Sequence, residues 1–211
     1  MTDFSALREQ MVKCHIEARG IADPAILAAF RSVPREEFVA KEMHAYAYDD
    51  GPLPIGSGQT ISQPYIVALM IEAAEITKAD HVLEVGAGSG YAAAVLGEVA
   101  GDVIAIERHA ELVALAGERI ARLGYGNVRI THGDGTLGFP GEAPFDAIFA
   151  AACGEEVPPA LVEQLKLGGR LVMPLGGRWS VQSLVRLVKR EDGSLERNRL
   201  CEVRFVPLIG G

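Results

Sequence analysis

Cysteine is scarce in this sequence: three occur in 211 residues, at Cys14, Cys153 and Cys201. An odd number of widely separated cysteines fits neither a disulfide framework nor the paired spacings of a zinc site. The five histidines form no H-x-x-x-H pair and join no cluster of carboxylates. We therefore expect reduced, buried thiols and no metal site.

The sequence also lacks any apolar run long enough to cross a bilayer. Its first twenty residues are charged throughout and contain no apolar stretch of the kind found in signal peptides. Hydrophobic residues nevertheless make up 49% of the chain, enough for a substantial core. The length suits one domain or a domain with an appendage. These features predict a cytoplasmic protein with no membrane partner.

Basic residues are in the minority, with 20 Lys+Arg against 28 Asp+Glu and a net charge of −8. An acidic surface repels phosphate backbones, so this balance disfavours nucleic acid as a partner. Composition alone leaves a local basic patch open.

The first part of the chain, residues 1–79, has helical apolar spacing followed by a turn-rich segment. Asp23-Pro24 predicts a helix start, with Asp as N-cap and Pro at the first helical position. Pro34 predicts another short helix. The glycine- and proline-rich residues 46–64 should form a long irregular loop with a function, because such loops in compact domains are usually functional or disordered. Within it, residues 58–64 are poor in both helix- and strand-forming residues.

The second part alternates strand and helix, and the third reads as a hairpin around the turn EDGS. This order predicts a doubly wound α/β fold: a mostly parallel sheet with helices on both faces, an antiparallel C-terminal edge and an N-terminal helical and loop extension. We expect strands at 81–86, 102–107, 127–134, 145–152 and 170–176, and helices at 91–100, 111–124 and 158–169.

A glycine-rich stretch, EVGAGSGY, follows the first expected strand and opens a helix. Gly86, Gly88 and Gly90 would let the backbone approach a ligand closely, and the helix start offers free N–H groups to an anion. A nicotinamide fingerprint wants a sixth-position glycine, where this chain has Tyr91. The pattern instead resembles the loop of S-adenosylmethionine-dependent methyltransferases. The alternative is a tight strand–helix turn.

Two acidic residues strengthen the cofactor interpretation. Glu107 ends the next strand, about 20 residues after the first glycine, where a carboxylate accepts ribose hydroxyls; the alternative is a solvated glutamate. Asp134 lies between Gly133 and Gly135 after the third strand and could accept a hydrogen bond from an adenine amino group, although Asp-Gly alone indicates an ordinary turn. Together these positions predict a nucleoside-bearing cofactor.

The chain resembles the protein-L-isoaspartate O-methyltransferases over nearly its whole length. Residues 58–64, GQTISQP, carry this resemblance more specifically than the glycine loop, which many methyltransferases share. The other matching motifs are VPREEFV (33–39), AYDDGPLPIGSGQTISQPYIVALM (47–70), VLEVGAGSGYAAAVL, GDGTLG, PFDAIFAAA, LKLGGRLVMPLG and VRFVPL.

The resemblance implies an enzyme that methylates the free carboxylate of L-isoaspartyl residues in damaged proteins and peptides. S-adenosyl-L-methionine would be the donor and S-adenosyl-L-homocysteine the product. Methyl esterification lets the succinimide reform and so initiates repair. Residues 1–79 would supply helices and a substrate lid, and residues 80–211 the cofactor-binding core with its hairpin, in one compact, monomeric unit.

The resemblance also implies site residues. Ser62 would be the catalytic residue, with Leu53, Pro54 and Ile55 beside the substrate backbone. The implied cofactor-binding residues are Thr60, Ile61, Gln63, Glu84, Gly86, Ala87, Gly88, Ser89, Gly90, Glu107, Arg108, Asp134 and Gly135.

Methyl transfer to a carboxylate would not require Ser62 to act as a general base. A carboxylate with a reference pKa of about 4 is already ionised at neutral pH, so methyl transfer requires no general base. A hydroxyl that orients one carboxylate oxygen while the other attacks would suffice. The rival interpretation, a hydrolase nucleophile, needs a base, and no G-x-S-x-G motif or histidine pattern supplies one.

Three positions depart from the family pattern. Ala87 and Ala151 stand where the family often has threonine, and Gly154 stands where it has proline. These changes leave a second class of function open: a cofactor-binding paralogue, or a methyltransferase acting on another small carboxylate. The intact TISQP block favours the repair enzyme.

Overall fold

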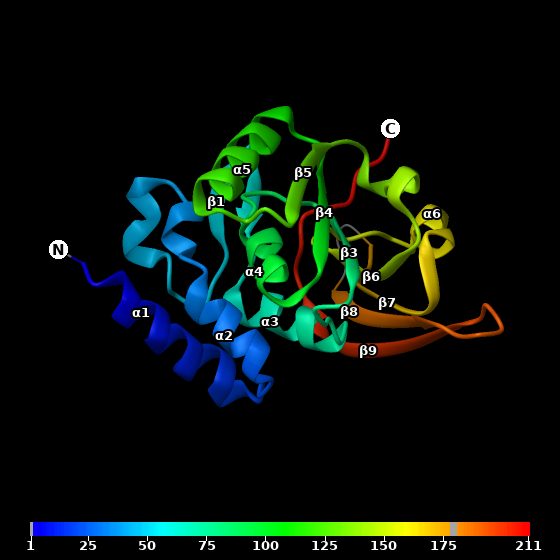
Figure 1. The fold of residues 1–211 in the computed structure, drawn as a ribbon, viewed down its shortest axis with the longest axis horizontal. Helices are drawn as coiled ribbons and strands as arrows, with labels where there is room; N and C mark the ends of the chain where they lie inside the picture. The colour runs from blue at the N-terminus through cyan, green and yellow to red at the C-terminus, as the bar shows by residue number, and fades with distance from the viewer. Residues whose placement is uncertain (1, 178–180) are drawn as a thin grey trace.

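A seven-stranded sheet forms the centre of the molecule, and the computed structural model describes residues 2–177 and 181–211. The strand order is β5-β4-β3-β6-β7-β8-β9 (Figure 1). The first five strands in this order pair in parallel, and β8 and β9 extend the sheet antiparallel. The expected α/β fold with an antiparallel C-terminal edge is confirmed.

The elements alternate as the sequence predicts, apart from two differences described below. The sheet strands are β3 (His81–Val85), β4 (Asp102–Glu107), β5 (Val128–His132), β6 (Phe145–Ala150), β7 (Leu165–Leu175), β8 (Gln182–Lys189) and β9 (Leu195–Val203). The α-helices are α1 (Phe4–Met11), α2 (Pro24–Ser32), α3 (Pro64–Ala73), α4 (Tyr91–Val99), α5 (Ala110–Leu123) and α6 (Pro159–Glu163).

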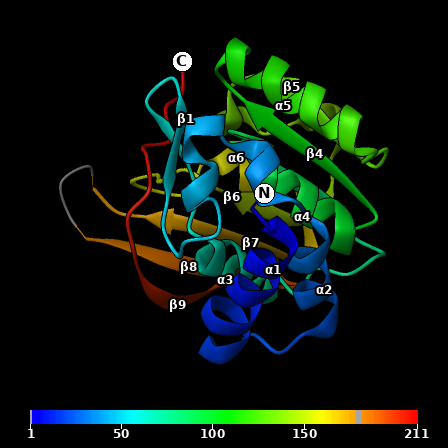
Figure 2. The ribbon, with the colours of Figure 1, turned by 90° about the vertical axis from the view of Figure 1, so that its left-hand side faces the viewer.

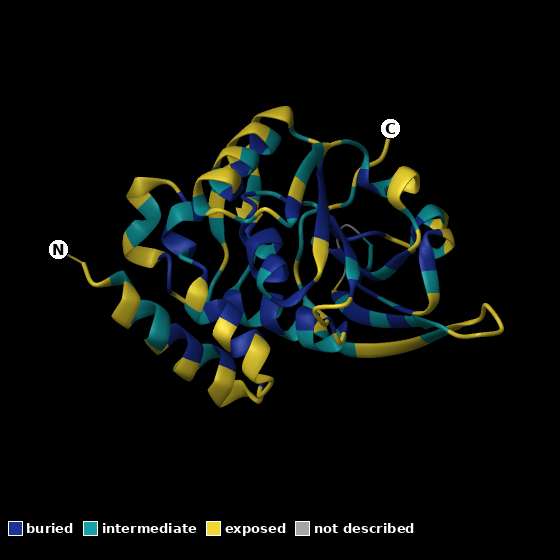
Figure 3. Ribbon diagram, in the orientation of Figure 1, coloured by how far each residue is buried: buried dark blue, intermediate teal, exposed yellow. Residues whose placement is uncertain are grey.

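Both faces of the sheet are covered, but unequally. Alternate strand residues such as Val82 pack in a large cluster with the N-terminal helices, α3 and α4. Their neighbours, such as Leu83, pack on the other face with Leu161 of α6. Figure 3 shows the buried central strands and the helices with one exposed side. The described N-terminal residues, 2–79, therefore share one core with the sheet. None of the described helices is long and apolar enough to span a membrane.

Local signals in the sequence set the ends of the helices. The Asp23 carboxylate accepts the N–H groups of Ala25 and Ile26 and caps α2, as expected. Gly124 ends α5 in the left-handed conformation at φ 82°, a backbone shape that costs glycine little.

Two expectations were wrong. The helix expected at 158–169 stops at Glu163, because Leu165 pairs with Phe145 and starts β7. Gly168, at φ 74°, then lies in an irregularity of the sheet and does not cap a helix. The loop at 46–64 was expected to be irregular, yet β1 (Leu53–Gly56) and β2 (Gln59–Ile61) pair as an antiparallel hairpin. We call this hairpin with Ser62 the lid hairpin.

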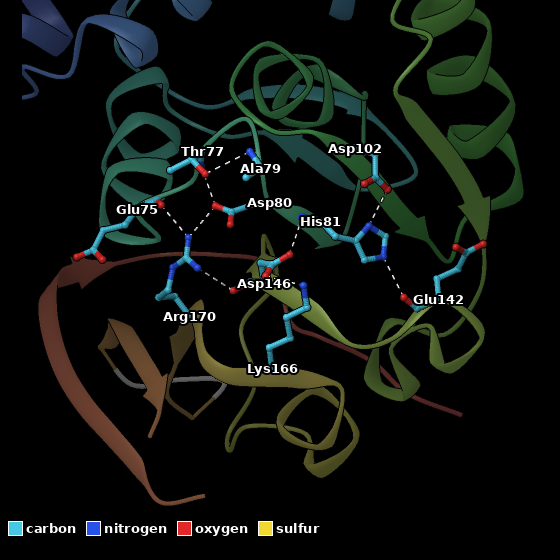
Figure 4. Close-up of polar contacts among 10 residues, drawn as sticks. All are labelled: Glu75, Thr77, Ala79, Asp80, His81, Asp102, Glu142, Asp146, Lys166 and Arg170. Atoms are coloured by element: carbon cyan, nitrogen blue, oxygen red, sulfur yellow. Dashed lines mark hydrogen bonds and ion pairs between the residues drawn. The ribbon is translucent and has the colours of Figure 1, made fainter. Parts of the chain in front are cut away.

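A polar network closes the amino end of the sheet (Figure 4). The Arg170 guanidinium donates to the carbonyls of Ala74, Glu75 and Asp146 and lies 2.8 Å from the Asp80 carboxylate. Both side chains of this ion pair are at most 14% exposed. His81 and Asp102, at the same amino end of the sheet, form a 2.6 Å contact between the imidazole and the carboxylate, but the Asp102 side chain is 55% exposed.

Asp80→Ala should destabilise the protein much more than Asp102→Ala. Removing Asp80 leaves a buried guanidinium without its carboxylate, which costs about 3 kcal/mol. Removing the exposed Asp102 should cost less than about 1 kcal/mol. Urea unfolding of both variants measures this, and equal losses would contradict the difference in burial.

Candidate functional site

A cavity lies at the carboxyl ends of the parallel strands, where open α/β sheets bind ligands. We call it the first cavity. Its described lining comes from the glycine loop, the ends of β4 and β6, the lid hairpin and the C-terminal segment 206–209. Figure 2 shows that segment running back along the molecule after β9.

The glycine loop adopts a backbone that only glycine accepts easily. Gly86, Gly88 and Gly90 have φ values of 90°, 54° and 87°, in the left-handed region that L side chains avoid. A Cβ on Gly88 would lie 3.1 Å from the Ile55 side chain, so the lid hairpin packs directly against this loop. The glycine loop is therefore a tight strand–helix turn, and it also lines a cavity. This geometry fits both interpretations of the glycine pattern.

The Glu107 carboxylate fixes the two loops that flank the first cavity. One of its oxygens accepts the N–H of Gly88 and the other the N–H of His109, both at 2.9 Å. Glu107 is 5% exposed, which excludes a solvated strand end. Each carboxylate oxygen can accept a second hydrogen bond, so this side chain could also receive hydroxyl groups from a ligand.

Glu84 brings a second carboxylate to the cavity wall. It is fully buried at the end of β3, and both its oxygens lack a hydrogen-bond partner among the described residues. Burial, and then the charge of Glu107, raise the pKa of Glu84 well above its ordinary value. A buried unpaired carboxylate lining a cavity suits a cationic ligand group.

The GDG turn differs in detail from what its sequence suggests. Gly135 is required by packing within the protein and not by a ligand, since a Cβ there would lie 2.4 Å from the Val85 side chain. One Asp134 oxygen accepts from Thr136, and the other accepts the Gly211 N–H at 2.8 Å. Asp134 is not among the described residues lining the first cavity. A ligand's amino group would have to share this carboxylate with the C-terminal segment.

Ser62 lies where the first cavity meets a second one. The second cavity is lined by Pro52, Gln63 and Ile66 on one side and by residues 202–206 on the other. The residues that line both cavities are Thr60, Ser62, Ala151 and Val206. A group bound in either cavity can thus reach the same serine.

The structure gathers most, but not all, of the expected site residues. Gln63 lines the second cavity, while Gly90 and the segment 53–55 line neither. The expected cofactor-binding residues found in the first cavity are Thr60, Ile61, Glu84, Gly86, Ala87, Gly88, Ser89, Glu107, Arg108 and Gly135.

Sequence reasoning missed one wall of the site. Residues 206–209 line the first cavity, held by hydrogen bonds from the Cys153 N–H to the Val206 carbonyl and from the Leu208 N–H to the Cys153 carbonyl. The sequence contains one signal for this segment, the VRFVPL motif shared with the family. Its residue pattern does not by itself indicate a ligand site. Cys153, 6% exposed, is a buried filler, as the sequence favoured.

These residues fit S-adenosyl-L-methionine. Its sulfonium and ammonium groups are cations, and Glu84 offers them an unpaired buried carboxylate. Its ribose hydroxyls match Glu107, and the glycine loop leaves space beside its backbone. Within the described ranges, no three His, Cys, Asp or Glu side chains gather as a metal site would require.

Comparison with protein families gives a match to the model for protein-L-isoaspartate(D-aspartate) O-methyltransferase (PCMT) over residues 6–211. The chain is 55% identical over 209 residues to protein-L-isoaspartate O-methyltransferase 1 of Rhodopseudomonas palustris (strain HaA2), covering 99% of this chain and 85% of that relative. The protein-L-isoaspartate O-methyltransferase of Methanoculleus marisnigri is 53% identical over 203 residues, covering 96% of this chain and 91% of that relative.

Two solved structures share the fold. A protein-L-isoaspartate O-methyltransferase superposes with a TM-score of 0.87 at 34% identity, covering 97% of this chain and 66% of the other, longer chain. A beta-aspartate methyltransferase (PCMT) from Plasmodium falciparum in complex with S-adenosyl-L-homocysteine gives a TM-score of 0.82 at 26% identity, covering 99% of both chains.

Glu84→Gln should change how stability depends on pH. Because the pKa of Glu84 is raised in the folded chain, the folded state keeps a proton that the unfolded chain loses near its ordinary pKa of 4.5. The free energy of unfolding from this group therefore falls as pH rises above that value. The variant should gain stability relative to the wild type as the pH rises above that value. Urea unfolding across this range measures the gain, and parallel pH curves would contradict it.

Proposed function

This chain belongs to the protein-L-isoaspartate O-methyltransferase family, and we propose that Ser62 is where its donor and its damaged substrate meet. The enzyme transfers a methyl group from S-adenosyl-L-methionine to the free carboxylate of L-isoaspartyl residues, the first step of their repair. The observation that carries the proposed site is that Ser62 lines both cavities. The donor would bind in the first cavity and the isoaspartyl segment in the second.

S-adenosyl-L-methionine supplies an electrophilic methyl group on its sulfonium. On the protein side, Glu84 would face the cationic end of the donor and Glu107 its ribose, with Thr60, Ile61 and Arg108 completing the wall. Asp134 would receive the adenine amino group alongside or in place of the Gly211 N–H. Gln63 and Gly90 would support this site from just outside the first cavity.

Ser62 would hold the substrate carboxylate. Its hydroxyl would donate to one carboxylate oxygen and leave the other free to attack. The carboxylate is already ionised at neutral pH, so no residue has to remove a proton. Orientation and exclusion of water can together contribute about 7–11 kcal/mol toward the barrier. The lid hairpin provides both, because it forms part of the lining of each cavity.

The second cavity suits an extended peptide. One of its sides includes residues 202 and 203 of the edge strand β9, and an edge strand offers backbone groups to an added strand. The segment continues through Phe205, whose backbone groups are bonded to the Gln182 side chain. Leu53, Pro54 and Ile55 form β1 beside Pro52, which lines this cavity. We propose that they shape the peptide site by fixing the lid hairpin.

The enzyme would act on isoaspartyl proteins and peptides as a cytoplasmic monomer, without nucleic acid or membrane. The net charge of −8 supports the absence of a nucleic-acid partner.

Incubation with a radiolabelled methyl donor and paired peptides tests the proposed function. One peptide carries L-isoaspartate and the other aspartate at the same position. Label should enter the isoaspartyl peptide only. Equal labelling of both peptides would point to the alternative, a methyltransferase for another carboxylate, and absence of label would point to a cofactor-binding paralogue.

Ser62→Ala and Glu107→Ala should separate the two cavities. Ser62→Ala should keep S-adenosyl-L-homocysteine affinity within about threefold yet lower kcat about 100-fold through lost orientation. Glu107→Ala should weaken that affinity about 10- to 100-fold, since it removes charge-assisted hydrogen bonds. Calorimetry and steady-state kinetics measure both. If Ser62→Ala abolishes cofactor binding, Ser62 belongs to the donor site alone.

A further inference from the structure

Arg35 is a fully buried cation that the mechanism above does not use. It begins the short helix η3 (Arg35–Phe38) and is among the largest completely buried side chains of the described residues. No carboxylate within the described ranges forms an ion pair with it at salt-bridge distance, although Asp50 contributes electrostatically. Burying a charge is costly, and an apolar side chain of similar size often serves packing as well. Packing alone therefore explains this guanidinium poorly.

The guanidinium donates hydrogen bonds to backbone carbonyls at both ends of the lid hairpin. Its Nε donates to the Ala47 carbonyl at 2.8 Å, and its Nη2 donates to the Gly51 carbonyl at 3.4 Å and the Ser62 carbonyl at 2.8 Å. These carbonyls lie just before the lid hairpin and at its end. One rigid planar group thus ties together both ends of the segment 47–62 and binds Ser62 itself.

The same guanidinium also contacts the donor side of the site. Its central carbon lies 4.7 Å from the centroid of the Tyr91 ring, within the range of a cation–π interaction. Tyr91 is the first residue of α4, directly after the glycine loop, and it lines the first cavity. Arg35 therefore links the backbone of Ser62 to the loop that would hold the donor.

The residue after Ser62 is held separately, by more exposed groups. The Gln63 side chain donates to the Asp50 carboxylate at 2.8 Å, and Arg19 donates to the same carboxylate. The Arg19 and Asp50 side chains are 43% and 19% exposed. Solvent weakens such contacts. The hydrogen bond from the buried Arg35 to the Ser62 carbonyl is therefore the stronger restraint on this end of the lid hairpin.

We propose that Arg35 is a positioning residue for methyl transfer, which fixes Ser62 relative to the glycine loop. The inference rests on the proposed role of Ser62. In-line transfer demands close control of geometry, and a misplacement of about 1 Å can cost about 100-fold in rate. Lysine would keep the charge but not the planar fork that reaches three carbonyls.

A double-mutant cycle of Arg35→Lys with Ser62→Ala tests this role. Arg35→Lys should lower kcat for an isoaspartyl peptide about 10- to 100-fold and leave S-adenosyl-L-homocysteine affinity within about threefold. In the Ser62→Ala background the same change should cost less than about threefold, because the group it positions is gone. A merely structural role would lower the rate equally in both backgrounds.

Arg170→Lys is the matched control. Arg170 is also largely buried and also donates to three backbone carbonyls, but at the amino end of the sheet (Figure 4). It should lower Tm as Arg35→Lys does while leaving kcat within about threefold and showing no coupling to Ser62→Ala. An equal loss of kcat in both lysine variants would overturn the proposal.

Arg35→Met covers the case in which the lysine variant does not fold. Methionine fills the space without a buried charge, so the protein should fold, and the loss of kcat and its coupling to Ser62→Ala should persist. Wild-type kcat in Arg35→Met would overturn the positioning role. Failure of the wild-type enzyme itself on the isoaspartyl peptide would count against the proposed function instead.

Discussion

The buried carboxylate of Glu107 is the contact on which the site depends. It accepts one backbone N–H from the glycine loop and one from the loop after β4, so two loops at the carboxyl end of the sheet keep a fixed separation. The carbonyl of Ile106, the residue before it, accepts the N–H groups of Gly86 and Ala87. Backbone groups of the glycine loop thus form this part of the cavity wall, and the positive φ angles of the loop require glycine. Glu84 adds a buried carboxyl group whose pKa is raised well above its ordinary value by burial and by the charge of Glu107, and a cationic ligand group would stabilise its charged form.

The N-terminal residues complete the site from the opposite side. They pack into the same core as the sheet, and they project the lid hairpin against the glycine loop through Ile55 and Gly88. The C-terminal segment closes the third side by its bonds to Cys153. Segments far apart in the sequence therefore converge on Ser62, where the two cavities meet. A site of this kind needs no ionisable catalyst, because its substrate arrives charged and only orientation is wanted.

Local chemistry predicted much of this fold, and tertiary packing explains the rest. Asp23 and Gly124 define helix ends by rules that hold within a few residues, and the alternation of short apolar strands with helices identified the parallel strands. The sequence around Leu165 reads as helix, yet its pairing with Phe145 makes it strand. Gln59 to Ile61 form a strand only because residues 53–56 lie opposite them. Resemblance, not pattern, pointed to Ser62, and neither indicated that the Gly211 N–H would bond to Asp134.

A crystal structure with S-adenosyl-L-homocysteine and an L-isoaspartyl peptide would show whether Ser62 lies between the donor and the substrate carboxylate. We expect the isoaspartyl carboxylate in the second cavity, with one oxygen within about 3 Å of the Ser62 hydroxyl. Its other oxygen should face the thioether sulfur in the first cavity. A peptide carboxylate bound away from Ser62, or a cofactor sulfur turned away from the junction of the two cavities, would contradict it.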